Sequence, residues 1–100
     1  MGETQIKRRS GTSVKLKEPP EMKVYILNDD VTPMEFVTSI LEKVFEKPEK
    51  EATVIMTTAH LLGKALVGKY NKNIAEKKVK ISETMAGLFG YPLKFQLEEA

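Results

Sequence analysis

Three polar side chains in one short segment, Asn28, Asp29 and Asp30, are the strongest candidates for binding chemistry in this sequence. They follow an apolar run that ends at Leu27, and a helix start follows them, which places them in a turn between a strand and a helix. Two carboxylates and an amide held in one turn form a cluster of hydrogen-bond acceptors. Such a cluster suits a small cation, an amine or a metal better than it suits an anion.

The helix start after this turn is well specified by its residue types. Thr32 is a candidate N-cap, Pro33 suits the first helical position, and Glu35 stands three residues after Thr32. Together they predict a capping box. We therefore expect the capping box to hold the acceptor cluster at a fixed place relative to the helix.

The single histidine, His60, is the other candidate for chemistry, and it shares a predicted helix face with Met56 and Ala59. A partly exposed helix histidine without a role is the simplest interpretation. An enzyme would pair Asp29 or Asp30 with His60 as acid and base, but the sequence offers no cysteine and no serine in a strained turn as a nucleophile. A metal site would need a ligand spacing that is not visible here. The residues favour a binding module over an enzyme, with no cofactor and no metal.

Length and composition are those of one small domain of 100 residues, 41% of them hydrophobic. The lack of cysteine agrees with a reducing cytoplasm, and no apolar run approaches the roughly 20 residues that span a bilayer. The net charge of +2 is unevenly placed. Residues 1–20 carry five basic against two acidic residues (+3), whereas residues 21–100 carry eleven lysines against twelve acidic residues (−1). Because the basic surplus lies outside the predicted domain, we expect neither nucleic acid nor a membrane as the main partner.

Apolar periodicity predicts the element order βααβαβ, an α+β domain whose three-stranded sheet is covered by helices on one face. We expect strands over residues 22–27, 64–70 and 93–97, and helices over about 33–46, 49–62 and 73–89, with Gly63 capping the second helix and Gly90 ending the third. Asn73 and Glu76 predict a second capping box. Residues 1–20 are predicted to be a disordered N-terminal extension, and residues 21–100 the folded domain.

Each predicted helix has an apolar face that we expect to pack on the sheet. These faces comprise Phe36, Val37, Ile40, Leu41, Val44 and Phe45 in the first helix; Ala52, Ile55, Met56, Ala59 and Leu62 in the second; and Ile74, Val79, Ile81, Met85, Leu88 and Phe89 in the third.

Several segments, taken together, resemble the ClpS family of bacterial adaptors. The run from Leu27 to Val37 reads LNDDVTPMEFV, Ala59-His60 is followed closely by Gly63-Lys64-Ala65, and Ala75-Glu76 and Pro92-Leu93 come later. The resemblance covers about residues 22–100. It implies the fold of the C-terminal domain of the bacterial ribosomal stalk protein, which has the same element order.

The resemblance also implies a function. ClpS-like domains bind the exposed N-terminal residue of a substrate protein when that residue is Leu, Phe, Tyr or Trp. They deliver the substrate to the ClpA or ClpC unfoldase for degradation by ClpP. The protein would then be a cytoplasmic bacterial adaptor, monomeric, and not an enzyme. The N-terminal extension would be engaged by the unfoldase during delivery.

Site residues follow from the resemblance by position. Asn28, Asp29 and His60 would hydrogen-bond the α-amino group, with Asp30 in support. Because an ammonium group needs a lone pair from the imidazole, the neutral form of His60 is expected to bind it. The pocket for the first side chain would be lined by Ile26, Leu27, Thr32, Met34, Val37, Met56, Ala59 and Leu93. The unfoldase would contact Asn73, Glu76 and Lys78.

Two positions depart from the family pattern. Ala59 stands where many members have Val, so we expect a pocket wider by about two methyl groups, one that favours large aromatic residues. Asn73 stands where well-known members have an acidic residue, which leaves the choice between ClpA and ClpC open. The alternatives to an adaptor are a stalk-like protein-interaction domain and, after it, a small acid–base or metal-dependent hydrolase. The stalk-like alternative leaves the acceptor cluster and His60 unexplained.

Overall fold

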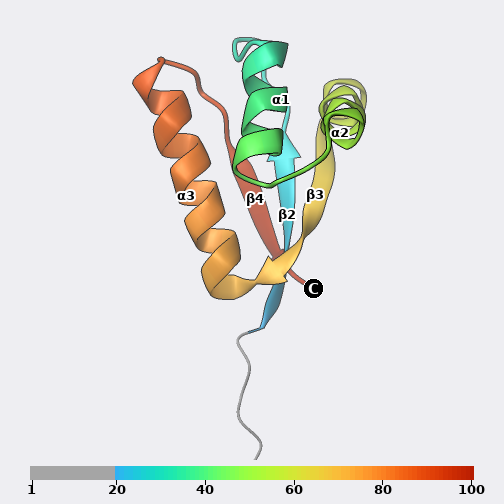
Figure 1. Ribbon diagram of the computed structural model, residues 1–100, viewed down its shortest axis with the longest axis vertical. Coiled ribbons are helices and arrows are strands. Elements are labelled where there is room, and N and C mark those ends of the chain that lie inside the picture. Colours follow the sequence, from blue (N-terminus) through green and yellow to red (C-terminus); the bar gives the residue numbers. More distant parts are fainter. Residues whose placement is uncertain (1–19) are drawn as a thin grey trace, which may run out of the picture.

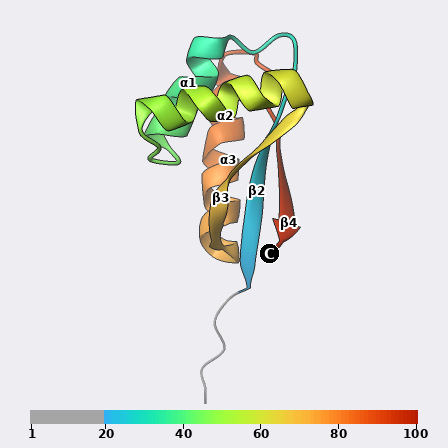
Figure 2. The same cartoon turned by 90° about the vertical axis from the view of Figure 1, so that its right-hand side faces the viewer.

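Three helices lie on one face of a three-stranded sheet in residues 20–100, the part of the chain that the computed structural model describes (Figures 1 and 2). The elements are β2 (Glu21–Leu27), α1 (Met34–Lys43), α2 (Glu49–Leu62), β3 (Lys64–Asn71), α3 (Lys72–Leu88) and β4 (Phe95–Glu99). This is the predicted βααβαβ order, and the α+β class is confirmed. The predicted N-terminal extension lies, except for Pro20, outside the described residues.

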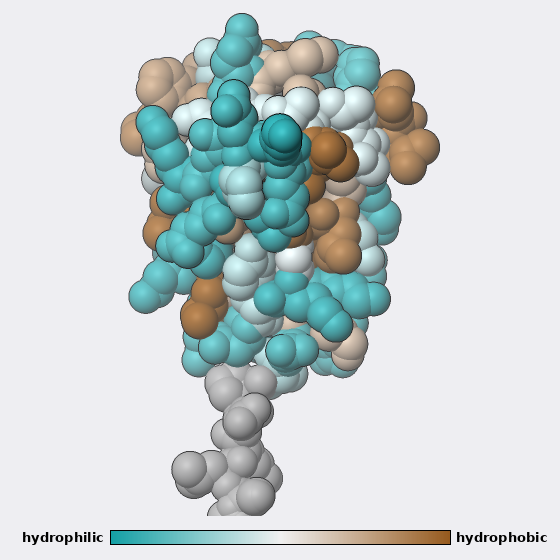
Figure 3. Space-filling view, turned by 45° about the vertical axis from the view of Figure 1, so that its right-hand side comes forward, coloured by the Kyte–Doolittle hydropathy of each residue, from teal (hydrophilic) through white to brown (hydrophobic). Residues whose placement is uncertain are grey.

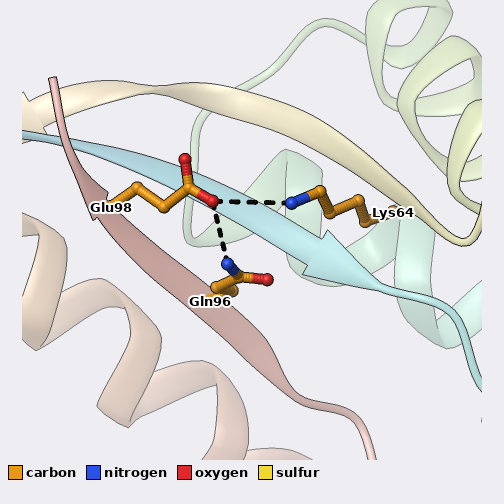
Figure 4. A network of polar contacts seen from close by, with 3 residues as sticks. All are labelled: Lys64, Gln96 and Glu98. Atoms are coloured by element: carbon orange, nitrogen blue, oxygen red, sulfur yellow. Dashed lines mark hydrogen bonds and ion pairs between the residues drawn. The ribbon is translucent and has the colours of Figure 1, made fainter.

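The central strand of the sheet is β2, which pairs antiparallel with β3 on one side and β4 on the other. Val24 and Ile26 are buried under the helices, whereas Tyr25 between them points to the opposite face. That open face carries a polar network. Lys64 Nζ lies 3.5 Å from Glu98 Oε2, and the Gln96 amide donates to the same Glu98 oxygen (Figure 4). The same Lys64 Nζ lies 4.5 Å from the centre of the Tyr25 ring.

The predicted faces of α1 and α2 form most of the helical side of the core. Val37, Ile40 and Leu41 of α1 are buried, as are Ala52, Ile55 and Ala59 of α2. Leu62 is 75% exposed, so its predicted place in the core is wrong. Gly63 caps α2 as predicted, with a left-handed φ of 93° and its N–H donating to the carbonyl of Ala59.

The start of α3 lies earlier than predicted. The N-cap is Asn71, whose side-chain oxygen accepts from the N–H of Ile74 at 2.9 Å, so the predicted capping box of Asn73 and Glu76 is wrong. Asn71 has extended backbone angles at the end of β3, which suit a cap, whereas Asn73 already lies within the helix.

The face that α3 turns to the sheet also differs from the prediction. The buried residues are small ones, Ala75, Ser82 and Ala86, while Ile81 and Leu88 are exposed. Ile74, Met85 and Phe89 of the predicted face are exposed as well, and Val79 is half-buried. Small side chains let the helix approach the core closely, so the large ones remain on the outside.

Two further boundaries shift. Helix α1 ends at Lys43 rather than near Glu46, because Glu46 takes a left-handed φ of 59° that no continuing helix allows. Pro48 stands at the N-cap position of α2, which begins at Glu49. The last strand begins at Phe95 rather than Leu93, although Leu93 and Phe95 are both buried.

The surface is mostly hydrophilic, with separate hydrophobic patches between polar side chains on the face that Figure 3 shows. Among the described residues, no helix is both long and apolar enough to cross a membrane.

Candidate functional site: a pocket at the end of the central strand

A cavity of about 160 Å³ opens where β2 ends, between α1 and α2. The structure brings all the residues predicted for amine binding and for the side-chain pocket to this one place. The cavity is lined by Ile26, Leu27, Asn28, Asp29, Asp30, Thr32, Met34, Val37, Met56, Ala59, His60 and Leu93. These residues come from the end of β2, the turn that follows it, α1, α2 and the segment before β4, so only the folded chain assembles them.

The Asp29 carboxylate organises the turn that borders the cavity. Its Oδ1 accepts from the backbone N–H of Val31 at 2.8 Å and of Thr32 at 2.7 Å, and its Oδ2 accepts from the Thr32 hydroxyl at 2.8 Å. Burial alone would raise the pKa of this carboxyl group. The two backbone N–H groups and the hydroxyl outweigh burial, so the pKa lies below its ordinary value. Asp29 is therefore held ionised and in a fixed orientation.

These bonds replace the predicted capping box. Pro33 occupies the N-cap position of α1 without a side-chain cap, and its carbonyl accepts from the N–H groups of Phe36 and Val37, each at 3.1 Å. The Thr32 hydroxyl cannot cap the helix because it points back to Asp29. The turn thus takes its shape from an Asx-type network before the helix, and the prediction of Thr32 as the N-cap is wrong.

Backbone hydrogen bonds bring the end of α2 to the end of β2. The N–H of Asn28 donates to the carbonyl of Gly63 at 2.9 Å, three residues beyond His60. The N–H of Leu27 donates to the carbonyl of Lys94 at 3.1 Å, next to Leu93. His60 and Asn28, 32 positions apart in sequence, therefore border the same cavity, and both are exposed at its mouth.

The interior of the cavity is apolar, in contrast with its mouth. Ile26, Ala59 and Leu93 are nearly inaccessible to solvent, and Val37 is also buried. Met34 is 53% exposed at the opening. An amino-acid side chain would thus enter an apolar compartment, while a charged group beside it would remain among the polar residues at the rim.

Asp30 differs from Asp29 although the two are adjacent. It is exposed, and its carboxylate makes no hydrogen bond to any other side chain or backbone group in residues 20–100. Asp29 has committed three of its lone pairs to the turn, whereas Asp30 keeps its acceptors available to a ligand.

The described residues do not bring three His, Cys, Asp or Glu side chains into the arrangement that a metal ion would need. The chemistry of the cavity fits a different ligand: an apolar side chain with a cationic amine close to it.

The three residues predicted for the unfoldase interface lie on α3 but in different environments. Asn73 and Glu76 are exposed. Lys78 is half-buried and donates from Nζ to the carbonyl of Val44 at 2.6 Å, with the ring centres of Phe45 and Tyr70 within 6.0 Å. Lys78 therefore binds the C-terminal end of α1, a structural role that the sequence did not indicate.

A second hollow, of about 300 Å³, lies beside Lys78. It is lined by Lys43, Val44, Ile74, Lys77, Lys78 and Ile81. Sequence reasoning missed this groove because Ile74 and Ile81, seven residues apart on one side of α3, were assigned to the core. The spacing of Ile74 and Ile81 relative to Lys77 and Lys78 was the sequence signal that could have indicated the groove.

Comparison with known proteins agrees with this geometry. The family model described as "ATP-dependent Clp protease adaptor protein ClpS" matches residues 17–96. The chain belongs to the ClpS family. The ClpS adapter of Cupriavidus metallidurans is 46% identical over 98 residues, covering 93% of this chain and 91% of the relative. That of Desulforapulum autotrophicum is 41% identical over 101 residues, covering 99% and 97%.

A solved ClpS structure has the same fold. Agrobacterium tumefaciens ClpS2 bound to L-phenylalaninamide superposes with a TM-score of 0.78 at 41% sequence identity, covering 82% of this chain and 99% of the other. The predicted family is confirmed. ClpS is a family of adaptors for the Clp protease, and the ClpS2 structure shares the fold described above.

Proposed function

We propose that this ClpS family member binds the first residue of other proteins when that residue is Leu, Phe, Tyr or Trp, and delivers those proteins to a Clp unfoldase. The observation that carries the proposal is the cavity, which combines an apolar interior with an acceptor-lined mouth. The ligand of the related ClpS2 has matching chemistry. L-phenylalaninamide has a free amine, a benzyl side chain, and an amide in place of the next peptide bond.

The α-amine would be held at the mouth by Asn28, Asp30 and His60. An N-terminal amine is largely protonated at neutral pH, with an ordinary pKa of about 7.7–8.0, so it suits acceptors. Asp29, to which sequence reasoning gave a direct contact, has its oxygens engaged by Val31 and Thr32. We therefore exchange the roles of the two aspartates: Asp30 contacts the amine, and Asp29 holds the turn.

The side chain of the first residue would fill the apolar interior. Ala59 and Met56 from α2 and Val37 from α1 form its walls, and Met34 closes it from the mouth. Methionine adapts its shape to both aliphatic and aromatic guests. Ala59 leaves room that a larger residue would occupy, so Phe, Tyr and Trp would be held at least as well as Leu.

The magnitudes are those of a transient adaptor. Burying a Leu or Phe side chain contributes about 1.5–3 kcal/mol, and each charge-assisted hydrogen bond adds about 1.5–3 kcal/mol. With three such bonds the gross sum is about 6–12 kcal/mol. At its upper end, and after an association cost of about 4 kcal/mol, a binding free energy of about −8 kcal/mol remains, which corresponds to micromolar affinity. No bond in the substrate is made or broken, so the proposed role is not enzymatic.

Delivery would use a different part of the surface. The groove between α1 and α3 has an apolar floor of Ile74 and Ile81 and lysines at its rim, which suits an unfoldase domain that presents apolar and acidic groups. Asn73 and Glu76 lie exposed on the same helix. Residues 1–17 would be needed for delivery but not for peptide binding. Their deletion should leave peptide affinity unchanged and impair degradation by ClpA or ClpC with ClpP.

Fluorescence titration with peptides tests the binding step. A Phe-initiated peptide should bind with micromolar affinity, and its N-acetylated copy, which differs only in the amine charge, should not. His60→Ala should weaken binding at least tenfold through the loss of a bond to a charged group. Equal binding of the free and acetylated peptides would refute the proposal. Binding of an unrelated protein without any peptide affinity would favour a stalk-like interaction domain.

A further inference from the structure

Three aromatic rings lie together where α3 ends; Phe89 is exposed, and Phe36 and Tyr91 are half-buried against the core. Phe36 of α1 meets Phe89 and Tyr91 edge-to-face, with ring centres 5.5 and 5.0 Å apart, and Phe89 and Tyr91 stack at 6.0 Å. We call these three residues the aromatic patch. Phe89 is 64% exposed, and Leu88 beside it is 81% exposed. An exposed apolar surface of this kind, with aromatic rings behind it, is characteristic of a binding surface.

The backbone beneath the patch is ordered by hydrogen bonds. The N–H groups of Phe89 and Tyr91 both donate to the carbonyl of Ala86, at 3.0 and 2.9 Å, and the N–H of Gly90 donates to the carbonyl of Gly87 at 3.0 Å. Gly90 takes a left-handed φ of 79°, which turns the chain back toward Tyr91. The backbone that carries Phe89 and Tyr91 is thus ordered by its own hydrogen bonds.

The patch adjoins the cavity through two segments of the chain. Phe36 precedes Val37, and Tyr91 stands two residues before Leu93; Val37 and Leu93 both line the cavity. Figure 1 shows the start of α1 and the C-terminal end of α3 at the same end of the molecule. The N-terminal turn of α1 therefore separates the patch from the cavity mouth.

The position of the amine sets the direction in which a bound chain leaves the cavity. The amine would be held by His60 at the end of α2 and by Asn28, which is bonded to the same end. The carbonyl branches from the same α-carbon and points away from the amine. The chain would then pass the exposed Met34 and cross the start of α1. A helix is about 10 Å across and an extended chain covers about 3.3 Å per residue. The fourth residue, about 10 Å from the first, therefore reaches the far side, and the third, about 7 Å away, comes within reach of it through its side chain.

We propose that the aromatic patch binds an apolar side chain at the third or fourth position of the substrate whose first residue occupies the cavity. This inference rests on the proposed function and extends it. The preferred substrates would begin with a large apolar residue and carry a second apolar residue two or three positions later. The first residue would determine whether a protein binds, and the apolar residue at the third or fourth position would determine how tightly it binds.

Two peptides that differ only at these positions test the inference. Both begin with Phe; one continues with serines, and the other has Leu at positions three and four. On the unmodified protein, the Leu peptide should bind about fivefold tighter, because partial burial of one Leu side chain is worth that factor. Phe89→Ser should remove this preference and leave the affinity for the serine peptide unchanged. Leu61→Ser, which removes a side chain that is 72% exposed on α2, should keep the preference.

Each other outcome has a defined meaning. Equal affinities of the two peptides for the unmodified protein would overturn the inference and leave the proposed function standing. Loss of the preference in Leu61→Ser would show that the peptide leaves the cavity over α2. Loss of binding of both peptides in Phe89→Ser would show that Phe89 maintains the structure of the binding site. Each of these two results overturns the inference. Self-association that Phe89→Ser abolishes, with equal peptide affinities, would assign the patch to a second copy of the chain. Failure of both peptides to bind the unmodified protein would refute the proposed function itself.

Discussion

Replacing Asp29 and Asp30 one at a time distinguishes the residue that stabilises the turn from the residue that binds the amine. Asp29→Asn keeps an oxygen for the N–H groups of Val31 and Thr32, and its amide can donate to the Thr32 hydroxyl. The turn should survive without the charge. Asp29→Ala removes all three hydrogen bonds. Asp30→Ala removes a carboxylate that makes none of them.

The magnitudes follow from these contacts. A side-chain acceptor that satisfies backbone N–H groups in this way contributes about 0.5–2 kcal/mol, so Asp29→Ala should lower the free energy of unfolding by about 1–2 kcal/mol. Asp30→Ala should change it by less than about 0.5 kcal/mol, as is usual for an exposed residue. Because Asp30 is exposed, we take the lower limit for a charged hydrogen bond, about 1.5 kcal/mol, and expect a roughly tenfold weaker affinity for a Phe-initiated peptide.

Urea unfolding and peptide titration on the three variants give the answer together. The expected pattern is intact stability with lost affinity for Asp30→Ala, lost stability for Asp29→Ala, and both properties nearly kept for Asp29→Asn. The reasoning would be refuted by a stable Asp29→Asn that loses tenfold in affinity while Asp30→Ala binds normally. In that case Asp29 would contact the amine in spite of its bonds within the turn.

Three further results are expected. Ala59→Val should narrow the cavity and weaken Trp-initiated peptides more than Leu-initiated ones in competition titrations; a uniform change for both would argue against a size effect. Lys78→Ala should lower the free energy of unfolding by about 1–2 kcal/mol through loss of its bond to the end of α1. Replacement of the exposed Lys77 by alanine serves as its control. An equal loss of unfolding free energy in both variants would show that Lys78 has no special role. The lowered pKa of Asp29 means that its ionised form contributes stability at neutral pH, which is lost as the pH falls below about 4. Asp29→Asn should flatten the stability curve there, and an unchanged curve in urea unfolding would show that other carboxyl groups dominate.

Much of the fold could be predicted from local patterns. The β-favouring and apolar run from Val24 to Leu27 predicts a strand, and the spacing of Val37, Ile40 and Leu41 predicts the buried face of a helix. A glycine after the last apolar residue predicts the left-handed C-cap of α2, which is Gly63. Each of these signals depends on neighbours within one or two turns of the chain, so no tertiary information is needed to read it.

The errors arise where a local signal competes with a contact made elsewhere. Thr32 has the residue type of an N-cap, but its hydroxyl donates to the Asp29 carboxylate instead of capping the helix. The large apolar residues of α3 suggest a core face, yet Ala75 and Ala86 are buried and Leu88 is not. Close packing against the sheet selects small side chains, and this selection becomes visible only when the sheet is in place.

The sequence by itself determined the order of the elements, the acceptor turn at residues 28–30 and, through its resemblance to ClpS, the set of residues around the cavity. Only the tertiary structure decided which of these residues are free to act. Asp29 and Asp30 are identical in type and adjacent in the chain, but one is bonded into the turn and the other is open at the mouth. Lys78 likewise has the residue type of a surface contact but supports the end of α1. Residue type fixes what a side chain can bond, whereas packing fixes which partner it meets.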